Sequence, residues 1–257
     1  MDLGIKGRTA LVLASTGGLG AAIATALGHE GANVVVCGRN GERAEELAAS
    51  LPSAVGLTVD LTEPGAVDAL LESTRSAFGD PDIVVLNGPG PAPSRAEDLD
   101  ADGARAAAEL LLLPHVAMVR ATLPAMRARG WGRILAVGSS GVEAPLANLS
   151  ASNVGRAALA AYLKTLASEV AADGVTVNML LPGRIGTDRL TRLDEAAAAR
   201  QGRPVEEVRA ASRAAIPVGR YGDPAEFGAV GAFLCSAQAS YVTGSLVRCD
   251  GGLLAHL

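Results

Sequence analysis

The sequence predicts an α/β fold of the doubly wound type, in which a parallel sheet lies between two layers of helices. Short runs that are apolar at every position recur along the chain, as expected for strands buried on both faces. Segments with helical spacing separate these runs. Polar or Gly-rich residues follow the strands at their carboxyl ends, where sheets of this type bind ligands. We therefore expect a single domain over residues 1–257.

The first predicted unit is strand, helix, strand. Thr9 to Leu13 forms the first strand, a turn of small residues runs from 14 to 20, and an Ala-rich helix ends at His29 before Gly31. The second strand runs from Asn33 to Cys37. Parallel neighbours need a helical crossover of this kind.

The same alternation continues to the carboxyl terminus. Pro64 is expected to open a helix at its first turn, and Pro114 should interrupt the helical segment after Leu113 because proline lacks an N–H donor. The expected strands are 55–59, 83–86, 131–137, 175–181 and 245–249, and the expected helices are 41–50, 64–78, 101–113, 114–129, 150–172 and 222–236.

The segment 188–217 is longer than an ordinary connection and reads as a lid over the substrate, with one helix at 204–215. Arg189, Arg192 and Arg203 in this lid are consistent with an anionic or carrier-linked ligand, although solvated arginines explain them equally well.

The turn before the first helix has the composition of a phosphate site. Glycine lets the backbone approach a ligand closely, and the free N–H groups of a helix amino terminus attract anions. A Gly-rich turn without a ligand remains the alternative, because the strict G-x-G-x-x-G spacing is absent. The second strand ends at Gly38 and Arg39, where an arginine favours NADP(H) over NAD(H), unless Arg39 is simply solvated.

Composition narrows the function classes. The net charge of −5 and the absence of a basic run disfavour nucleic acid and anionic membranes as partners. No apolar run reaches the ~18 residues of a membrane span, so we expect a cytoplasmic protein. The three cysteines form no CxxC pair, and we expect free thiols and no metal.

Over essentially the whole chain the order of motifs resembles the short-chain dehydrogenase/reductase family, near the 3-oxoacyl-acyl-carrier-protein reductases. The resemblance implies a Rossmann fold. It rests on the Gly loop, Asp60 after the third strand, the turn from Asn87 to Gly90, Ser139 after the fifth strand, and the downstream motifs Val177–Asn178, Pro182–Gly183, Thr187, 241–244 and 250–252. In the Gly loop, Leu13 and Ala14 stand where the family has Thr and its first Gly.

The resemblance also implies a set of cofactor-binding residues. In the family the residue at Asp60 contacts adenine, and the segment from Pro182 to Thr187 holds the nicotinamide. The implied set is Ser15, Thr16, Gly18, Leu19, Gly20, Arg39, Asp60, Leu61, Asn87, Gly88, Arg156, Pro182, Gly183, Ile185 and Thr187.

At the catalytic positions the chain departs from the family. The family uses Ser, Tyr, Lys and a helix Asn; here Ser139 matches, while Ser152, Arg156 and Leu111 occupy the other three positions. An aliphatic hydroxyl is a far weaker acid than a Tyr with pKa ~10, and Arg keeps its proton to above pKa ~12. Ser152 is therefore a poor proton donor, whereas Arg156, one helical turn away, still supplies a cation for the nicotinamide ribose.

Two interpretations of this site remain open. Ser139, Ser152, Asn153 and Arg156 form a working polar set in the first, with Ser139 and Asn153 bonding a carbonyl and Arg156 stabilising an oxyanion. In the second the site has drifted, and these groups are satisfied locally. His115 is a possible substitute acid, but a lone His on an apolar helix is more often structural.

Three functions follow from these interpretations. The first is an NADP(H)-dependent oxidoreductase acting on a carbonyl or secondary alcohol, with a small-molecule substrate. The second is a nucleotide-binding protein of this fold without redox turnover or with other chemistry, and the third binds no dinucleotide. Family analogy adds a homo-oligomer, a dimer or tetramer, formed through the long helices.

Overall fold

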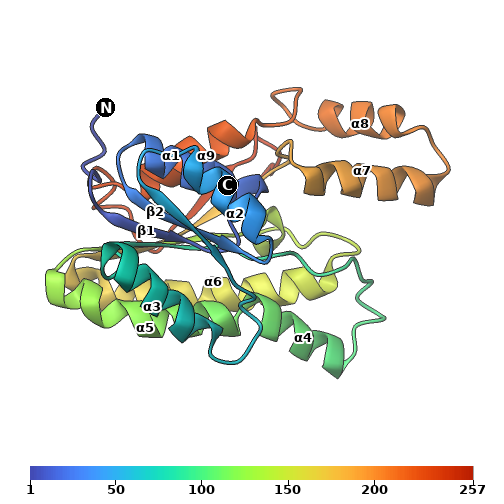
Figure 1. Cartoon of the computed structure of the whole chain (residues 1–257). Coiled ribbons are helices and arrows are strands. Elements are labelled where there is room, and N and C mark those ends of the chain that lie inside the picture. The colour runs from blue at the N-terminus through green and yellow to red at the C-terminus, as the bar shows by residue number, and fades with distance from the viewer. Residues whose placement is uncertain (257) are drawn as a thin grey trace.

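The computed structural model describes residues 1–256, and in this part of the chain seven parallel strands form one sheet in the order β3-β2-β1-β4-β5-β6-β7. The strand order reverses between β1 and β4, which marks the switch point of a doubly wound sheet (Figure 1). The strands are β1 Thr9–Val12, β2 Asn33–Gly38, β3 Ala54–Thr58, β4 Ile83–Leu86, β5 Gly132–Val137, β6 Val175–Pro182 and β7 Leu246–Cys249.

Helices cover both faces of the sheet, with α1, α2 and α9 on one face and α3 to α6 on the other (Figure 1). Alternate residues of β1 serve the two cores: Ala10 and Val12 pack with α1 and α9, whereas Leu11 packs on the opposite side. The helices are α1 Gly18–His29, α2 Gly41–Ala49, α3 Ala66–Phe78, α4 Ala101–Leu111, α5 Leu113–Arg129, α6 Ser150–Val170, α7 Asp188–Gln201, α8 Val205–Ala214 and α9 Pro224–Leu234.

The predicted interruption near Pro114 is present. The helix breaks at Leu112, whose backbone leaves helical geometry at φ −121° and ψ −59°, and α5 restarts with Pro114 in its first turn. By length and mean hydropathy the segment 101–129 would suffice to cross a membrane. In the structure this segment is two helices, and Leu111, Met118 and Met126 are buried in the protein core, so the observation is weak evidence for a span.

Two expectations about the helices were wrong. The third helix begins at Ala66 rather than Pro64, because Gly65 precedes it in a left-handed conformation, φ 77°. The lid contains two helices rather than one. In addition to α8, residues Asp188–Gln201 form α7, which Thr187 caps through its hydroxyl and Gly202 ends at φ 61°. Figure 1 shows α7 and α8 side by side, projecting beyond the sheet.

Candidate active site

Four loops meet where β1, β4, β5 and β6 end, and we call this side of the sheet the carboxyl edge. These strands are consecutive neighbours in the sheet, so the residues that follow them are brought close together. The loops are 14–20, 87–90, 139–141 and 182–187. The candidate residues of the sequence are therefore collected on the edge where doubly wound sheets bind ligands.

The loop after β1 leaves the amino end of α1 free. Gly17 precedes the helix without a side-chain cap, and the first turn contains no acidic residue. Gly20 has no room for a side chain, since a Cβ there would lie 2.6 Å from the Asn87 amide nitrogen. Ala14 adopts a left-handed φ of 46°, a conformation that costs an L-residue about 1–2 kcal/mol. Unpaired N–H groups at a helix amino terminus suit an anion.

The hydroxyl of Ser15 bonds within the protein. The residue is fully buried. Its hydroxyl donates to the carbonyl of Val12 at 2.7 Å and accepts from the Cys37 N–H at 3.1 Å. Ser15 therefore ties the turn after β1 to the neighbouring strand β2, and its contact with a cofactor stays a prediction. Thr16, Gly18 and Leu19 remain at the surface of the loop.

The loops after β2 and β3 lie at the other end of the candidate nucleotide site. Gly38 has no room for a side chain because Thr16 packs against it, and Arg39 is exposed. Asp60 accepts hydrogen bonds from the hydroxyl of Thr62 at 2.7 Å and from its N–H at 3.0 Å. These bonds, with a smaller contribution from the nearby charge of Arg39, lower the pKa of Asp60. Leu61 is half-buried beside Asp60.

After β4, Asn87 supports the Gly loop. Its side-chain amide donates to the carbonyl of Ala14 at 2.9 Å, which joins the ends of β1 and β4. The adjacent Gly88 lies against the ring of His115. His115 is buried, with Nδ1 2.8 Å from the carbonyl of Leu111, and burial lowers its pKa. A neutral ring bonded to backbone favours the structural interpretation of His115 over that of a substitute acid.

Ser139 begins the loop after β5. Its oxygen accepts from the N–H of Gly141 at 3.1 Å, so the hydroxyl proton is left for another acceptor. Arg156 reaches the same strand end from α6 and donates through Nη1 to the carbonyl of Val137 at 2.7 Å. Burial, reinforced by the charge of Arg189, lowers the pKa of Arg156 to about 10. The structure thus brings Ser139 and Arg156 to the end of one strand.

Ser152 and Arg156 lie one turn apart on α6 and both are buried. The hydroxyl of Ser152 has no hydrogen-bond partner within residues 1–256, and its oxygen is not sealed from solvent by the residues around it. An unpartnered hydroxyl beside Arg156 is available to a ligand.

The side chain of Asn153 makes its hydrogen bonds to backbone groups, and not in the direction expected for a substrate carbonyl. Its amide nitrogen donates to the carbonyl of Leu146 at 2.9 Å, and its oxygen lies 3.4 Å from the Leu146 N–H. The side chain therefore holds the loop before α6 onto the helix. Because both ends of the amide are occupied by backbone, we do not assign Asn153 a bond to a substrate carbonyl.

The loop after β6 closes the site from the lid side. Gly183 lies against the backbone of Asp250, where a side chain would not fit, and Ile185 is buried in the core beside α1 and α9. Thr187 comes close to Gly18: a Cβ built on Gly18 would lie 3.8 Å from the Thr187 methyl group. The segment from Pro182 to Thr187 therefore faces the amino end of α1.

The tyrosines of the chain lie away from this site. Tyr162 follows Ser152 by ten residues on α6, roughly 15 Å along the helix axis, and packs against the core. Tyr221 donates its hydroxyl to Asp194 of α7 at 2.8 Å, and Tyr241 is fully exposed. The expectation that Tyr162 is a packing residue agrees with this position.

Two features of the lid were not expected from the sequence. Arg189 was expected only as one of several lid arginines, but its guanidinium lies directly over Gly90 at the carboxyl edge. Asp194 is buried and accepts a hydrogen bond from Tyr221, which pins α7 to the rest of the protein. Thr187 and Gly202, a cap and a stop that bracket a helix, could have signalled α7 itself but neither of these contacts.

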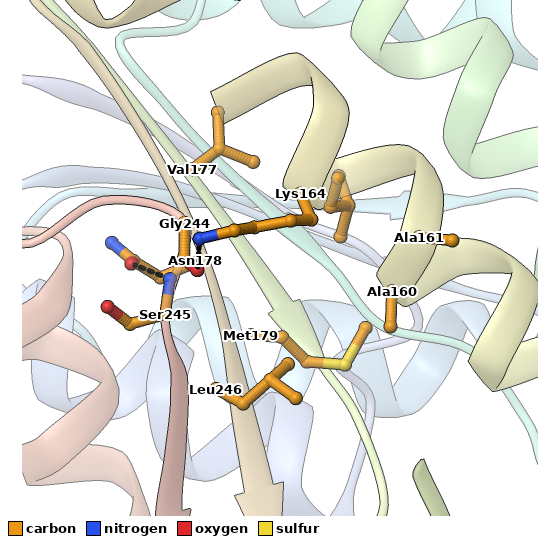
Figure 2. A pocket seen from close by; sticks show the side chains of 10 residues that line it. Ala160, Ala161, Lys164, Val177, Asn178, Met179, Gly244, Ser245 and Leu246 are labelled. Atoms are coloured by element: carbon orange, nitrogen blue, oxygen red, sulfur yellow. Dashed lines mark hydrogen bonds between the residues drawn. The ribbon is translucent and has the colours of Figure 1, made fainter. Parts of the chain in front are cut away.

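A cavity of about 370 Å³ lies between α6 and β6 near the start of β7 (Figure 2). Its polar groups are already paired: Lys164 donates to the carbonyl of Gly244 at 2.8 Å, and Asn178 accepts from the Ser245 N–H at 3.1 Å. A second cavity of about 160 Å³ is lined by Arg184, Gly222 and Asp250. Within residues 1–256 no group of three His, Cys, Asp or Glu side chains could hold a metal ion.

Comparisons with known proteins cover nearly the whole chain. The family model described as enoyl-(acyl carrier protein) reductase matches residues 13–254. D-beta-hydroxybutyrate dehydrogenase of Cupriavidus necator is 32% identical over 98% of this chain and 100% of its own length. The 3-oxoacyl-[acyl-carrier-protein] reductase FabG of Salmonella typhimurium is 31% identical over 98% of this chain and 99% of its own.

Solved structures agree with this similarity. L-sorbose reductase of Gluconobacter frateurii, solved with NADPH and L-sorbose, superposes with a TM-score of 0.93 at 34% identity and 100% coverage of both chains. YwfH, an NADPH-dependent reductase involved in bacilysin biosynthesis, gives a TM-score of 0.92 at 26% identity, covering 97% of this chain and 99% of its own.

Proposed function

The chain belongs to the short-chain dehydrogenase/reductase family, and on this premise we propose that it is an NADP(H)-dependent oxidoreductase acting on a carbonyl compound or a secondary alcohol. The observation that carries the proposal is the carboxyl edge, where an uncapped helix amino terminus after β1 and a serine with an uncommitted hydroxyl proton after β5 lie at the same edge of the sheet, on either side of the loop after β4.

The residues at this edge fit a pyridine dinucleotide. The free N–H groups of α1 suit a diphosphate, and Gly18 and Gly20 leave the backbone open to it. By the family resemblance Asp60 and Leu61, which follow β3, would contact the adenine, Asn87 and Gly88, which follow β4, would lie between the two halves, and Thr187, after β6, would lie beside the nicotinamide. Exposed Arg39 supports NADP(H) over NAD(H), because its charge suits a 2′-phosphate.

When bound, NADPH would supply a hydride to a carbonyl carbon. Ser139 would donate a hydrogen bond to the carbonyl oxygen through its free hydroxyl proton and so hold that oxygen in position. Arg156 would bind the nicotinamide ribose and place a positive charge near the oxygen as negative charge develops there. Ser152 offers a second hydroxyl, one helical turn from Arg156.

The catalytic set would lack the usual Tyr and Lys. Ser152 does not replace Tyr as an acid, so the proton would come from water or from an acidic hydroxyl of the substrate. Loss of a positioned acid costs about 10²- to 10⁴-fold in rate. The proposal is therefore a slow reductase in which positioning supplies most of the rate enhancement.

The test follows NADPH absorbance with a panel of ketones, in the wild type and in Ser139→Ala. We expect measurable turnover that falls by about 10²-fold in Ser139→Ala, with unchanged affinity for NADPH. Ser168→Ala, at the exposed far end of α6, is the control and should match the wild type. NADPH binding without oxidation by any ketone would instead indicate a nucleotide-binding protein, and no binding at all would reject the cofactor.

We also propose a cytoplasmic homo-oligomer, a dimer or tetramer, formed through the long helices. Leu113 at the start of α5 is 54% exposed and Val154 on α6 is 46% exposed, and large apolar side chains are better covered than left in water. Light scattering after size exclusion tests the state, and Leu113→Glu should shift it toward monomer.

A further inference from the structure

Glu143 and Arg248 form the best shielded ion pair among the described residues. Arg248 donates through Nε to Oε2 of Glu143 at 2.5 Å, and only 18% of the Glu143 side chain and 25% of the Arg248 side chain are exposed. In each of the other ion pairs within residues 1–256, at least one side chain is exposed by 33% or more. A shielded pair is screened less by salt, so it can hold two segments together.

The pair joins segments that lie far apart in the sequence. Arg248 lies on β7 opposite Leu181 of β6. Because Leu181 packs in the core on the α6 side of the sheet, the Arg248 side chain leaves the sheet on that side too. Glu143 ends the short 3-10 turn Ser140–Val142, which directly follows Ser139. The ion pair therefore spans β6 and connects the last strand of the sheet with the loop that carries Ser139.

The backbone from Ser139 to Glu143, which we call the Ser139 turn, makes its hydrogen bonds within itself. The N–H of Gly141 donates to the Ser139 hydroxyl oxygen at 3.1 Å, and the N–H of Glu143 donates to the carbonyl of Ser140 at 3.1 Å. These bonds set the shape of the turn but not its position relative to the sheet. That position depends on β5 before the turn, on the packing of Val142 in the α6-side core and on the carboxylate of Glu143.

Arg248 also holds the carboxyl-terminal segment. Its Nη1 donates to the carbonyl of His256 at 2.5 Å. Between these two residues, Asp250 accepts hydrogen bonds from two backbone N–H groups, and the carbonyl of Gly251 accepts from the N–H of Val218 at the end of the lid. A planar guanidinium that serves two partners has a fixed direction. The Ser139 turn, the carboxyl-terminal segment and the end of the lid therefore share one support on β7.

Resting on the proposed function, we propose that Arg248 and Glu143 are positioning residues for Ser139. Their ion pair holds the Ser139 turn in place, so that the serine hydroxyl is aimed at the carbonyl oxygen of a bound substrate. Neither residue meets the substrate or the cofactor. A displacement of about 1 Å can cost an enzyme about 100-fold in rate. Loss of the pair should therefore lower kcat and leave cofactor binding as it was.

The experiment removes the pair from both sides. Arg248→Met removes the cation, Arg248→Lys keeps a charge without the guanidinium fork, and Glu143→Gln removes the anion and keeps the shape. Arg248→Met and Glu143→Gln are each made in the wild type and in Ser139→Ala. The control is Arg75→Met, which breaks an ion pair with Asp80 between α3 and β4, at the opposite edge of the sheet.

The first measurement is ketone reduction with NADPH. We expect kcat to fall by about 10- to 100-fold in Arg248→Met and in Glu143→Gln, with the KM for NADPH unchanged. Arg248→Lys should recover part of the loss, and Arg75→Met should match the wild type. In Ser139→Ala, where the hydroxyl is already gone, Arg248→Met should cost about 2-fold or less. An equal loss in both backgrounds would show a general structural effect and overturn the proposal.

The second measurement is hydrogen exchange followed by mass spectrometry, which needs no substrate. Peptides covering residues 139–149 should exchange about 5- to 10-fold faster in Arg248→Met and in Glu143→Gln. Peptides covering the loop 14–20 should not change, and Arg75→Met should leave both regions as they are. Unchanged exchange over 139–149 in both variants would overturn the proposal, because the Ser139 turn would then be held without the pair.

The two measurements separate this inference from the proposed function. If the wild type reduces no ketone, exchange decides: faster exchange over 139–149 in both variants supports the pair as the support of the Ser139 turn, while the reductase assignment fails. If ketones are reduced and exchange is unchanged, the reductase assignment stands and the pair is rejected.

Discussion

Replacement of Arg156 by Met should make the protein more stable while it weakens the active site. Burial, reinforced by the charge of Arg189, lowers the pKa of Arg156 to about 10. At about 1.4 kcal/mol for each tenfold change in proton affinity, holding this charge in the folded state costs roughly 3 kcal/mol at neutral pH. Met fills a similar volume and carries no charge.

Part of this gain is lost again. Arg156→Met leaves the carbonyl of Val137 without the bond that Nη1 donates, at a cost of about 1–2 kcal/mol. The net expectation is a stabilisation of about 1–2 kcal/mol, or a rise in Tm of about 2–8 °C for a chain of this size. Urea denaturation without cofactor measures it. NADP⁺ affinity and turnover should both fall.

Arg133→Met is the matched control, because Arg133 is a buried arginine that is well satisfied. It donates to the carbonyls of Ser236, Gly132 and Gly174, and it stacks on Trp131 with the guanidinium carbon 4.3 Å from the ring centre. Its replacement removes three hydrogen bonds and the stacking on Trp131, although the Gly174 carbonyl keeps its bond from the Gly132 N–H, and should destabilise by about 3 kcal/mol or more. If Arg156→Met lowers the free energy of unfolding by as much as Arg133→Met does, Arg156 is structural and its charge is not the source of a stability penalty.

The pH dependence gives a second check on Arg156. The pKa of Arg156 in the folded state lies below its value in the unfolded state, so the stability penalty is fully present below about pH 10 and disappears as the pH rises from there toward the unfolded pKa. The stability difference between Arg156→Met and the wild type should therefore narrow above pH 10. A difference that stays constant from pH 7 to 11 would contradict a buried charge as its source.

Three shorter predictions concern other parts of the site. Arg39→Gln should raise the Kd for NADPH by about 10- to 100-fold and leave that for NADH unchanged in fluorescence titrations; equal effects on both would reject a 2′-phosphate contact. Ala14→Gly should stabilise by about 0.5–1 kcal/mol in urea, since it relieves the φ of 46°, and a loss of stability would show that no strain is stored there. Ser152→Tyr combined with Arg156→Lys should raise ketone turnover by about 10²- to 10⁴-fold, and unchanged turnover would argue against the assigned positions.

The sheet could be predicted from the sequence because each of its central strands is apolar at every position. Every residue of β1 and β4 is buried, so each strand appears as an unbroken apolar run. The loops after these strands inherit their place from the topology. The positions of Asn87 and Ser139 at the ligand edge could therefore be predicted before any of their contacts was known.

The helix α7 could not be predicted in the same way. Its buried stripe is Leu190, Asp194 and Ala198, one residue wide and containing a carboxylate. Such a helix has no apolar face that a periodicity would reveal. Asp194 is tolerated inside because Tyr221, 27 positions later in the chain, donates a hydrogen bond to it and Arg184 forms an ion pair with it. Contacts of this kind are specified by tertiary structure.

The polar residues of the carboxyl edge look alike in the sequence but divide into two groups in the structure. Ser15, Asn87 and Asn153 direct their hydrogen bonds at backbone groups and so fix the shape of the loops. Ser139 and Ser152 keep hydroxyl protons free, and Arg156 uses only Nη1. Among the described residues, the side-chain atoms that are buried without a partner are Thr176 Oγ1 and Ser212 Oγ, which belong to β6 near its start and to α8, so the open donors of the carboxyl edge remain within reach of solvent. Donors that the fold holds in place beside an uncapped helix, and that no protein group occupies, are the ones that a ligand can meet.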